Sequence, residues 1–355
     1  MVLAARIPIA PRPEQGLFKD RFIIAQILLS YKEQIHGSQS EPLPACGLPV
    51  GSVFLRRIRL SISEEHSLRI TGCFPAAERR FMRLLFIRHG DPDYANDCLN
   101  QIGISEAKAL SVLCPQLSLG TCYASPLGRA QETAAIALGR AVEGAHGAAA
   151  AANCGDILTT FDWLREFPAL VDVNDTPLLQ DAYYQLLLPD GSYKPRIVWD
   201  MYPSYYMEHK AYSDNDEWRT TLVAHHSDLL SVYDYVTTSF DNLLAEHGYV
   251  RDDRHYRVDG ESVETLTFFC HFGITCVLLS HLWNISPFVP LQCFCMPTSS
   301  VTELFTEERQ KGYANFRATR IGDTSHLTMA GLRTQRLPHS ALFTEVYSDL
   351  TQRHD

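Results

Sequence analysis

Short apolar runs recur along the chain from residue 82 onward, and each is followed by a polar turn and then by apolar residues at helical spacing. Residues 84–87 form a continuous apolar run, as expected for a central parallel strand that is covered on both faces. Further strands are predicted at residues 121–124, 266–270 and 316–321. This pattern is typical of an α/β protein and predicts a three-layer α/β/α sandwich with a mostly parallel central sheet.

Helices are predicted between these strands, where apolar residues repeat every three or four positions; they lie at residues 105–113, from residue 126 to about 138, and at residues 228–247 and 274–283. In the second of these, Ser125 is the expected N-cap and Pro126 the expected first helical residue. Pro287 is expected to close the last one, because proline cannot continue a helix.

A long interval, residues 172–262, separates two of the predicted core units. We expect it to be a helical insertion that covers one edge of the sheet as a lid. Aromatic residues crowd its segment 199–212. Under the other interpretation, these aromatic side chains fill the insertion's own core.

The composition changes near residue 82. Residues 1–81 hold 11 lysines and arginines against 7 acidic residues, whereas residues 82–355 hold 20 against 34. The first segment is rich in proline and has no sustained periodicity, apart from a short hairpin that residues 53–62 could form. Residues 1–81 are therefore expected to be a poorly ordered extension or the product of an upstream start codon, and residues 82–355 the folded domain.

The net charge of −10 argues against nucleic acid and anionic membranes as partners. An acidic protein that binds an anion must build a local positive pocket. The ten cysteines show no metal-site spacing and are expected to be reduced, which points to the cytoplasm. No signal peptide or membrane span is predicted, because polar residues and prolines interrupt the apolar stretch 277–297.

Three polar turns follow predicted strands, and they carry Arg88-His89-Gly90, residues 125–129 and His271-Phe272-Gly273. The turns after parallel strands gather at one edge of a sheet, where ligands bind and where helix N-termini favour anions. Two arginines and two histidines are therefore expected to converge on one anion, at the edge that the predicted lid covers.

These residue types suit phosphoryl transfer. Arg88 and Arg129 can donate forked hydrogen bonds to phosphate oxygens. A neutral His89 can attack phosphorus, while His271 donates to the developing charge. Glu166 is the chosen proton donor for the leaving oxygen, and Asp162, one helical turn earlier, is the reserve. The alternative for Glu166 is a solvated helix residue paired with a cation. This set needs no metal ion, and no cofactor is expected.

The segments 86–90, FIRHG, and 124–134, ASPLGRAQETA, followed by a second histidine near a glycine, resemble the histidine phosphatase superfamily, which contains the phosphoglycerate mutases. The resemblance extends from residue 82 to about residue 330. It implies that Arg88, His89, Arg129 and His271 form the phosphate pocket and that His89 becomes phosphorylated. It also implies that Glu166 corresponds to the family's proton donor.

The chain departs from the mutases of this family after the first motif. Residues 91–94 read DPDY, with Asn96 beyond, where mutases carry Glu or Gln, then Ser or Thr, and soon Trp-Asn. This difference favours a hydrolase. Asn96 and His326 are further candidates for the pocket, whereas His225 and His226 are expected to be solvated rather than to bind a metal.

Three functions follow from this sequence. The first is a metal-independent phosphatase that hydrolyses a small phosphorylated metabolite through phosphohistidine on His89. The second is a phosphomutase, which must protect that intermediate from water. The third is a binding module that holds a phosphorylated ligand without turnover. The identity of the substrate and the oligomeric state are left open.

Overall fold

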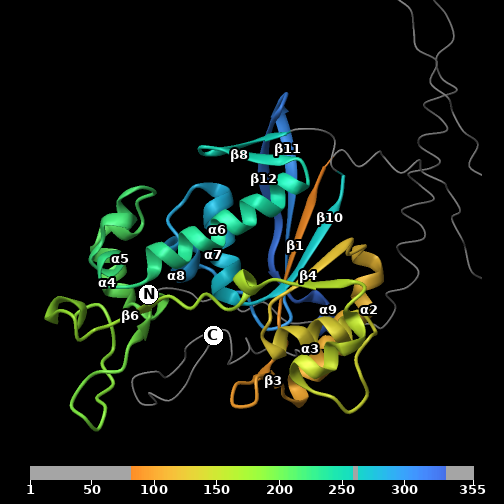
Figure 1. Ribbon diagram of the computed structural model, residues 1–355, viewed down its shortest axis with the longest axis horizontal. Helices are drawn as coiled ribbons and strands as arrows, with labels where there is room; N and C mark the ends of the chain where they lie inside the picture. The colour runs from red at the N-terminus through yellow and green to blue at the C-terminus, as the bar shows by residue number, and fades with distance from the viewer. Residues whose placement is uncertain (1–80, 259–262, 333–355) are drawn as a thin grey trace, which may run out of the picture. The chain divides into compact units, whose positions relative to one another are not determined.

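The computed structural model describes residues 81–258 and 263–332 (Figure 1). Its centre, within these residues, is a mixed eight-stranded sheet with the order β5 (Leu158–Thr160), β4 (Thr121–Ala124), β10 (Thr265–Cys270), β1 (Arg83–Arg88), β11 (Val301–Gln310), β12 (Tyr313–Asp323), β9 (His255–Val258) and β8 (Tyr249–Asp252). The first four strands are parallel to one another, as predicted. From β11 to β8 each strand is antiparallel to its neighbour.

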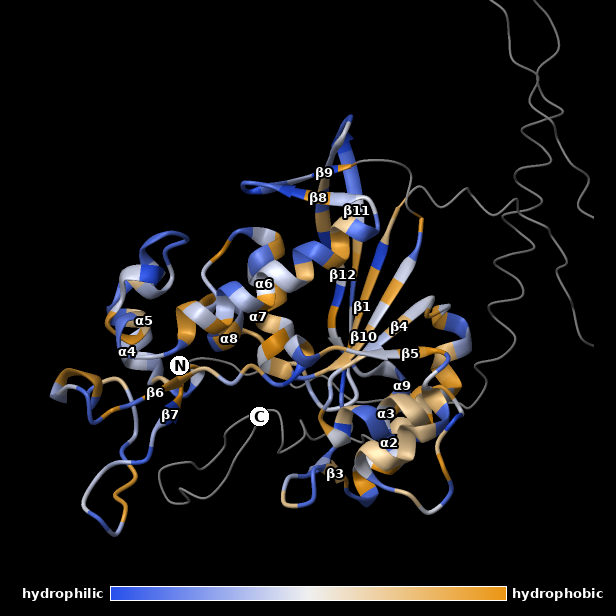
Figure 2. Cartoon of the chain, in the orientation of Figure 1, coloured by the Kyte–Doolittle hydropathy of each residue, from blue (hydrophilic) through white to orange (hydrophobic). Residues whose placement is uncertain are grey.

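Helices cover both faces of this sheet, so the predicted three layers are confirmed (Figure 1). Along β1, Leu84 and Phe86 join one core cluster, which includes residues of α6 (Leu229–Glu246) and α7 (Phe272–Trp283). Leu85 and Ile87 join a second cluster with α2 (Gln101–Leu117) and α3 (Gly128–Ala137). This alternation explains the uninterrupted apolar run, because successive side chains of a strand point to opposite faces. Figure 2 shows hydrophobic residues on the strands and on the helices against them.

The remaining elements are short. They comprise two small antiparallel pairs, β2 (Pro92–Asp93) with β3 (Cys98–Leu99) and β6 (Leu170–Val171) with β7 (Arg196–Ile197). The other α-helices are α4 (Pro203–Glu208), α5 (Leu222–His225), α8 (Phe288–Cys293) and α9 (Ser325–Met329). The 3-10 helices are η1 (Gly147–Cys154), η2 (Asp162–Leu164), η3 (Pro177–Leu179), η4 (Val198–Asp200), η5 (Lys210–Tyr212) and η6 (Glu217–Thr220).

One helix starts later than predicted, and another ends at the predicted residue for a different reason. Helix α3 begins at Gly128 rather than at Pro126, because Leu127 has an extended backbone and is the N-cap residue. The Ser125 hydroxyl accepts the N–H of Leu127 at 3.1 Å, so it caps the turn before the helix instead of the helix itself. Helix α7 ends at Trp283, where Asn284 takes a left-handed conformation with φ 54°, so the helix stops before Pro287 is reached.

Within the interval 172–262, two of the crowded aromatic residues, Trp199 and Tyr212, are buried in the core cluster that lies against α6 and α7. Tyr202 is exposed, and Tyr205 and Tyr206 are half-buried. Residues of this interval therefore contribute to the main core, and its role as a lid stays a prediction. The predicted extension and its hairpin lie outside the described residues.

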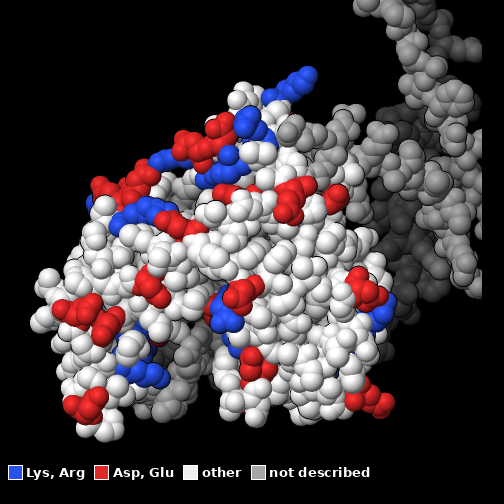
Figure 3. All heavy atoms as spheres, viewed as in Figure 1, with Lys and Arg blue, Asp and Glu red and all other residues white. Residues whose placement is uncertain are grey.

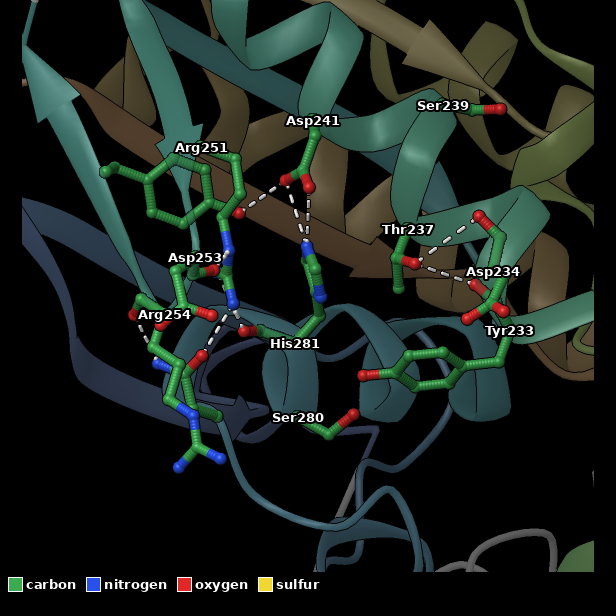
Figure 4. A network of polar contacts seen from close by, with 12 residues as sticks. Tyr233, Asp234, Thr237, Ser239, Asp241, Arg251, Asp253, Arg254, Ser280 and His281 are labelled. Atoms are coloured by element: carbon green, nitrogen blue, oxygen red, sulfur yellow. Dashed lines mark hydrogen bonds and ion pairs between the residues drawn. The ribbon is translucent and has the colours of Figure 1, made fainter. Parts of the chain in front are cut away.

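A polar network joins α6 and α7 to the antiparallel end of the sheet (Figure 4). Asp241 of α6 accepts the Tyr256 hydroxyl at 2.6 Å and contacts Nε2 of His281 at 2.9 Å through both carboxylate oxygens. Burial, with the Asp241 charge as a second cause, raises the pKa of Tyr256. Arg251 of β8 donates to the carbonyl oxygen of His281 at 3.2 Å and to Oδ1 of Asn284 at 2.5 Å. These contacts fasten β8 and β9 to the helical layer.

Charged residues of both signs are interspersed on the face that Figure 3 shows. Many are paired with one another; examples are Arg254 with Asp216 at 2.5 Å and Arg257 with Asp252 at 3.2 Å. Among the described residues, no helix is both long enough and apolar enough to cross a membrane.

Candidate active site

The two histidines follow neighbouring parallel strands at the same edge of the sheet. Arg88, the last residue of β1, pairs in register with Cys270, the last residue of β10. His89 and His271 therefore leave the sheet side by side, and their ring centroids lie 5.0 Å apart. Neither histidine has any solvent-exposed surface. The sheet thus provides the convergence that the three turns predicted.

The ring of His89 has a defined tautomer. Its Nδ1 lies 2.7 Å from the carbonyl oxygen of Gly90, which can only accept a hydrogen bond, so Nδ1 carries the proton. The lone pair of the neutral ring is therefore on Nε2. Burial lowers the pKa of His89 well below its usual value, and the charges of Arg88 and Arg129 lower it further. A neutral imidazole with this tautomer is suited to nucleophilic attack through Nε2.

Arg129, in the first turn of α3, reaches His89 directly. Its Nε donates to Nε2 of His89 at 3.4 Å, and its Nη1 lies 2.7 Å from Oδ1 of Asp97. Arg88 is equally buried, and its Nη1 donates to the carbonyl oxygen of Met296 at 2.8 Å. Its Nε and Nη2 have no hydrogen-bond partner among the described residues. Buried donors of this kind can bind an oxyanion.

His271 completes the group. Its Nε2 lies 2.7 Å from the Ser125 hydroxyl, and its Nδ1 has no partner among the described residues. Burial is the main cause that lowers the pKa of His271 well below its usual value. The neighbouring His89, Arg129 and Arg88 lower this pKa further. Two neutral imidazoles and two guanidinium groups thus share one buried region, which can neutralise a phosphate and supply a nucleophile.

Glu166 lies beside this group, at the N-terminus of α7. Its Oε1 accepts the backbone N–H of Phe167 at 2.9 Å and of Ile274 at 3.2 Å. A Cβ atom added to Gly273 would lie 2.8 Å from this same oxygen. Gly273, two residues after His271, therefore lies close to the carboxyl group of Glu166.

The local structure around Glu166 differs from the helix that the sequence suggested. The 3-10 helix η2 ends at Leu164, and Arg165 after it has an extended ψ of 163°. Asp162, the reserve proton donor, is exposed and pairs with Arg165 at 3.3 Å. Half-buried Glu166 and exposed Asp162 thus have different surroundings.

The remaining candidates lie next to the group rather than within it. Asn96 is exposed, and its Nδ2 donates to Oδ2 of Asp93 in the same loop at 2.8 Å. His326 is buried and contacts the Ser299 hydroxyl at 3.4 Å, while the N–H of Ser299 donates to the carbonyl oxygen of His89 at 2.9 Å. His326 thus touches a residue that supports the backbone of His89.

The histidine pair at 225 and 226 shows no metal-site geometry. His225 is exposed, and Nδ1 of His226 lies 3.5 Å from Oδ2 of Asp175. Within residues 81–258 and 263–332, no three His, Cys, Asp or Glu side chains converge closely enough to hold a metal ion.

Sequence reasoning missed two residues of the site. It considered Ser125 only as a helix cap, although its hydroxyl contacts His271. It did not single out Asp97, which lies in the turn between β2 and β3, where no periodicity marks a residue's direction. The position of a polar loop residue depends on contacts made far along the chain, here with Gly128 and Arg129.

Residues 84–146 match the histidine phosphatase superfamily (branch 1). This match confirms the resemblance over a segment that contains Arg88, His89 and Arg129, while Glu166 and His271 lie beyond it. No curated protein sequence matches the chain.

Similar solved structures include a mycobacterial glucosyl-3-phosphoglycerate phosphatase in complex with VO3, which is 17% identical and covers 68% of this chain and 99% of its own, with a TM-score of 0.40. Another is a phosphoserine phosphatase from Entamoeba histolytica in complex with 3-phosphoglyceric acid. It is 14% identical, the match covers 69% of this chain and 99% of that chain, and the TM-score is 0.38. A third is mycobacterial hydrolase 1, which is 17% identical. The match covers 69% of this chain and 100% of that chain, with a TM-score of 0.41.

Proposed function

We propose that this protein is a phosphatase that hydrolyses small phosphomonoesters through a phosphohistidine formed on His89. The main support is the state of His89. Its ring is neutral, its proton is on Nδ1, and its Nε2 lies beside the guanidinium group of Arg129. The match of residues 84–146 to the histidine phosphatase superfamily supports the same reaction. The named activities of two similar structures, which are phosphatases, agree with it.

In the first step, the non-bridging oxygens of the substrate bind Arg88, Arg129 and His271, which offset the negative charge that repels a nucleophile. Nε2 of His89 forms a bond to phosphorus as the bond from phosphorus to the ester oxygen breaks. Glu166 transfers its proton to that oxygen, so the substrate's alcohol leaves as a neutral molecule.

In the second step, the carboxylate of Glu166 takes a proton from water, and the water oxygen bonds to phosphorus. The bond from phosphorus to Nε2 breaks, phosphate is released, and both His89 and Glu166 return to their starting protonation states. All the groups in this sequence are side chains of the chain itself.

The test uses the full chain with chelator present, p-nitrophenyl phosphate and a panel of phosphorylated sugars, nucleotides and glycerates. We expect phosphate release, and an acid-labile, alkali-stable phosphate label on the wild-type protein after rapid quenching. His89→Asn should lose the label and at least about 10³-fold of the turnover rate.

His146→Asn is the matched control, because the side chain of His146 is largely exposed and its ring pairs with Glu132 rather than with Arg88, His89, Arg129 or His271. It should label and turn over like the wild type. Full activity of His89→Asn would overturn the mechanism. Isomer exchange without phosphate release would identify a mutase, and ligand binding without turnover would identify a binding module.

A further inference from the structure

The carboxylate of Asp97 occupies a position between the candidate phosphate pocket and solvent. Its Oδ1 lies 2.7 Å from Nη1 of Arg129, and its Oδ2 accepts the N–H of Gly128 at 2.7 Å. The side chain of Arg129 is 10% exposed and that of Asp97 41% exposed. A guanidinium group assigned to phosphate is therefore already paired with an anionic group of the protein.

The backbone of Asp97 packs closely against Gly128, the first residue of α3. A Cβ atom on Gly128 would lie 2.1 Å from the carbonyl oxygen of Asp97, so glycine is needed for this close approach. The same loop has a second anchor, because Leu99 donates its N–H to Oε2 of Glu132 at 2.8 Å. The side chain of Asp97 can thus release Arg129 while the loop stays attached to α3.

Arg129 must change partners before the reaction can begin. Its Nε–H points at Nε2 of His89, whose lone pair has to attack phosphorus. Its Nη1 is held by Asp97. Binding of a phosphoryl group therefore requires the Nε–H of Arg129 to turn away from His89, and the pairing of Nη1 with Asp97 leaves fewer of its five N–H donors for the phosphoryl oxygens.

We propose that Asp97 sets the affinity of the site for phosphate by competing with phosphoryl oxygens for Arg129. This inference rests on the proposed function, in which Arg129 binds phosphate. Carboxylate and phosphate oxygens are equivalent acceptors for a guanidinium group, and a carboxylate beside Arg129 weakens its attraction for a second anion. As product phosphate leaves, Asp97 pairs with Arg129 again. This exchange speeds the release of phosphate, which a hydrolase requires.

The test measures the equilibrium binding of inorganic phosphate to the full chain by titration calorimetry. Asp97→Asn keeps an oxygen that can accept the N–H of Gly128 but removes the charge. Its dissociation constant for phosphate should fall on the order of tenfold, with a matching increase in phosphate inhibition of p-nitrophenyl phosphate hydrolysis. Asp97→Glu keeps the charge and should stay within about threefold of the wild type.

Asp93→Asn is the matched control. It removes the same charge from the same loop, but Asp93 contacts Ala95 and Asn96 instead of Arg129. Its phosphate affinity should stay within about twofold of the wild type. If Asp97→Asn does not fold, Asp97→Ser, which also lacks the charge and can accept the N–H of Gly128, should show the same tighter binding.

Phosphate binding by Asp97→Asn that is unchanged or weaker would overturn the proposal, as would equal tightening in Asp93→Asn or Asp97→Glu. Binding does not depend on turnover, so the role of Asp97 can fail while hydrolysis stands, or hold while hydrolysis fails. A wild-type protein that binds no phosphate would overturn both.

Discussion

The backbone N–H groups of Phe167 and Ile274 both hold Glu166. Because both N–H groups donate to Oε1, a proton on the carboxyl group of Glu166 belongs on Oε2. A general acid matters most when the leaving alcohol is a poor leaving group, because such an oxygen cannot depart as an anion. This difference between substrates gives a way to recognise the proton donor.

Glu166→Gln should therefore lower kcat/KM, which reports the first step and not the later attack of water, by about 10²-fold or more for an alkyl phosphate, and far less for p-nitrophenyl phosphate, whose leaving group is a stable anion. Steady-state kinetics with the two substrates measure the effect. Asp162→Asn is the control, because exposed Asp162 pairs with Arg165 and should leave both rates unchanged. Equal losses with both substrates would contradict the role of Glu166 as acid.

At the residue scale, the sequence was sufficient to predict that His89, His271 and Arg129 lie together, because each directly follows a strand or begins a helix. The sequence could not predict the tautomer of His89, which depends on the 2.7 Å contact with the Gly90 carbonyl. Nor could it predict the partner of Arg129, because Asp97 reaches it from the turn between β2 and β3.

At the scale of elements, the start of α7 is a crowded junction near the site. A Cβ atom on Gly273 would lie 2.7 Å from Cη2 of Trp199 and 2.8 Å from Oε1 of Glu166. Since Trp199 is buried in the core and Glu166 is held by the helix N-terminus, neither can move away at low cost.

Gly273→Ala should consequently lower the free energy of unfolding by about 1–3 kcal/mol and reduce turnover, because overpacking displaces Glu166. Urea denaturation and steady-state kinetics check the two effects. Gly155→Ala is the matched control, since nothing lies within 4 Å of its added Cβ atom. It should change stability by less than about 0.5 kcal/mol. A fully stable and active Gly273→Ala would show that this junction is not tight.

The elements themselves were largely predictable, because periodicity marks a strand or a helix from its own residues. Strand β4 has the predicted bounds of 121–124, and α7 includes the predicted helix 274–283. The start of α3 was not predictable, because it depends on whether the backbone of Leu127 is extended or helical. The hydroxyl of Ser125, which accepts the N–H of Leu127 in this turn, also contacts Nε2 of His271.

For the whole molecule, two fully buried histidines carry a consequence for stability. The pKa values of His89 and His271 are lowered well below the usual 6.5 in the folded protein, chiefly by burial. The unfolded chain keeps ordinary histidine pKa values and takes up protons as the pH falls below about 6.5, while the folded protein does not. The stability that these residues contribute is therefore present above pH 6.5 and decreases toward acid pH.

The free energy of unfolding should fall between pH 6.5 and pH 5 by up to about 1.4 kcal/mol per pH unit for each of the two histidines. Urea denaturation at several pH values measures this slope. His89→Asn should remove the share of this slope that His89 contributes. An unchanged slope in His89→Asn would mean that this ring is protonated in the folded protein.

At this scale three strands of the parallel half, β1, β4 and β10, were predicted from their apolar runs, whereas β5 was not. In the antiparallel half, from β11 to β8, only the strand at 316–321, within β12, was predicted. The attachment of this half to β1, as in the pair of Leu85 with Glu303, joins residues far apart in the sequence and was not predicted. Whether residues 172–262 act as a lid likewise depends on contacts that no local pattern encodes.

The sheet ends on β8, and an outermost strand offers unpaired backbone groups with which another chain could align. The network around Asp241 fixes this strand to α6 and α7, and β8 carries Arg251 and Asp252 close to its end. Charged side chains on a short, tethered border strand oppose edge-to-edge aggregation. The contacts in Figure 4 thus hold β8 in place and oppose edge-to-edge pairing at the far end of the described sheet from β5.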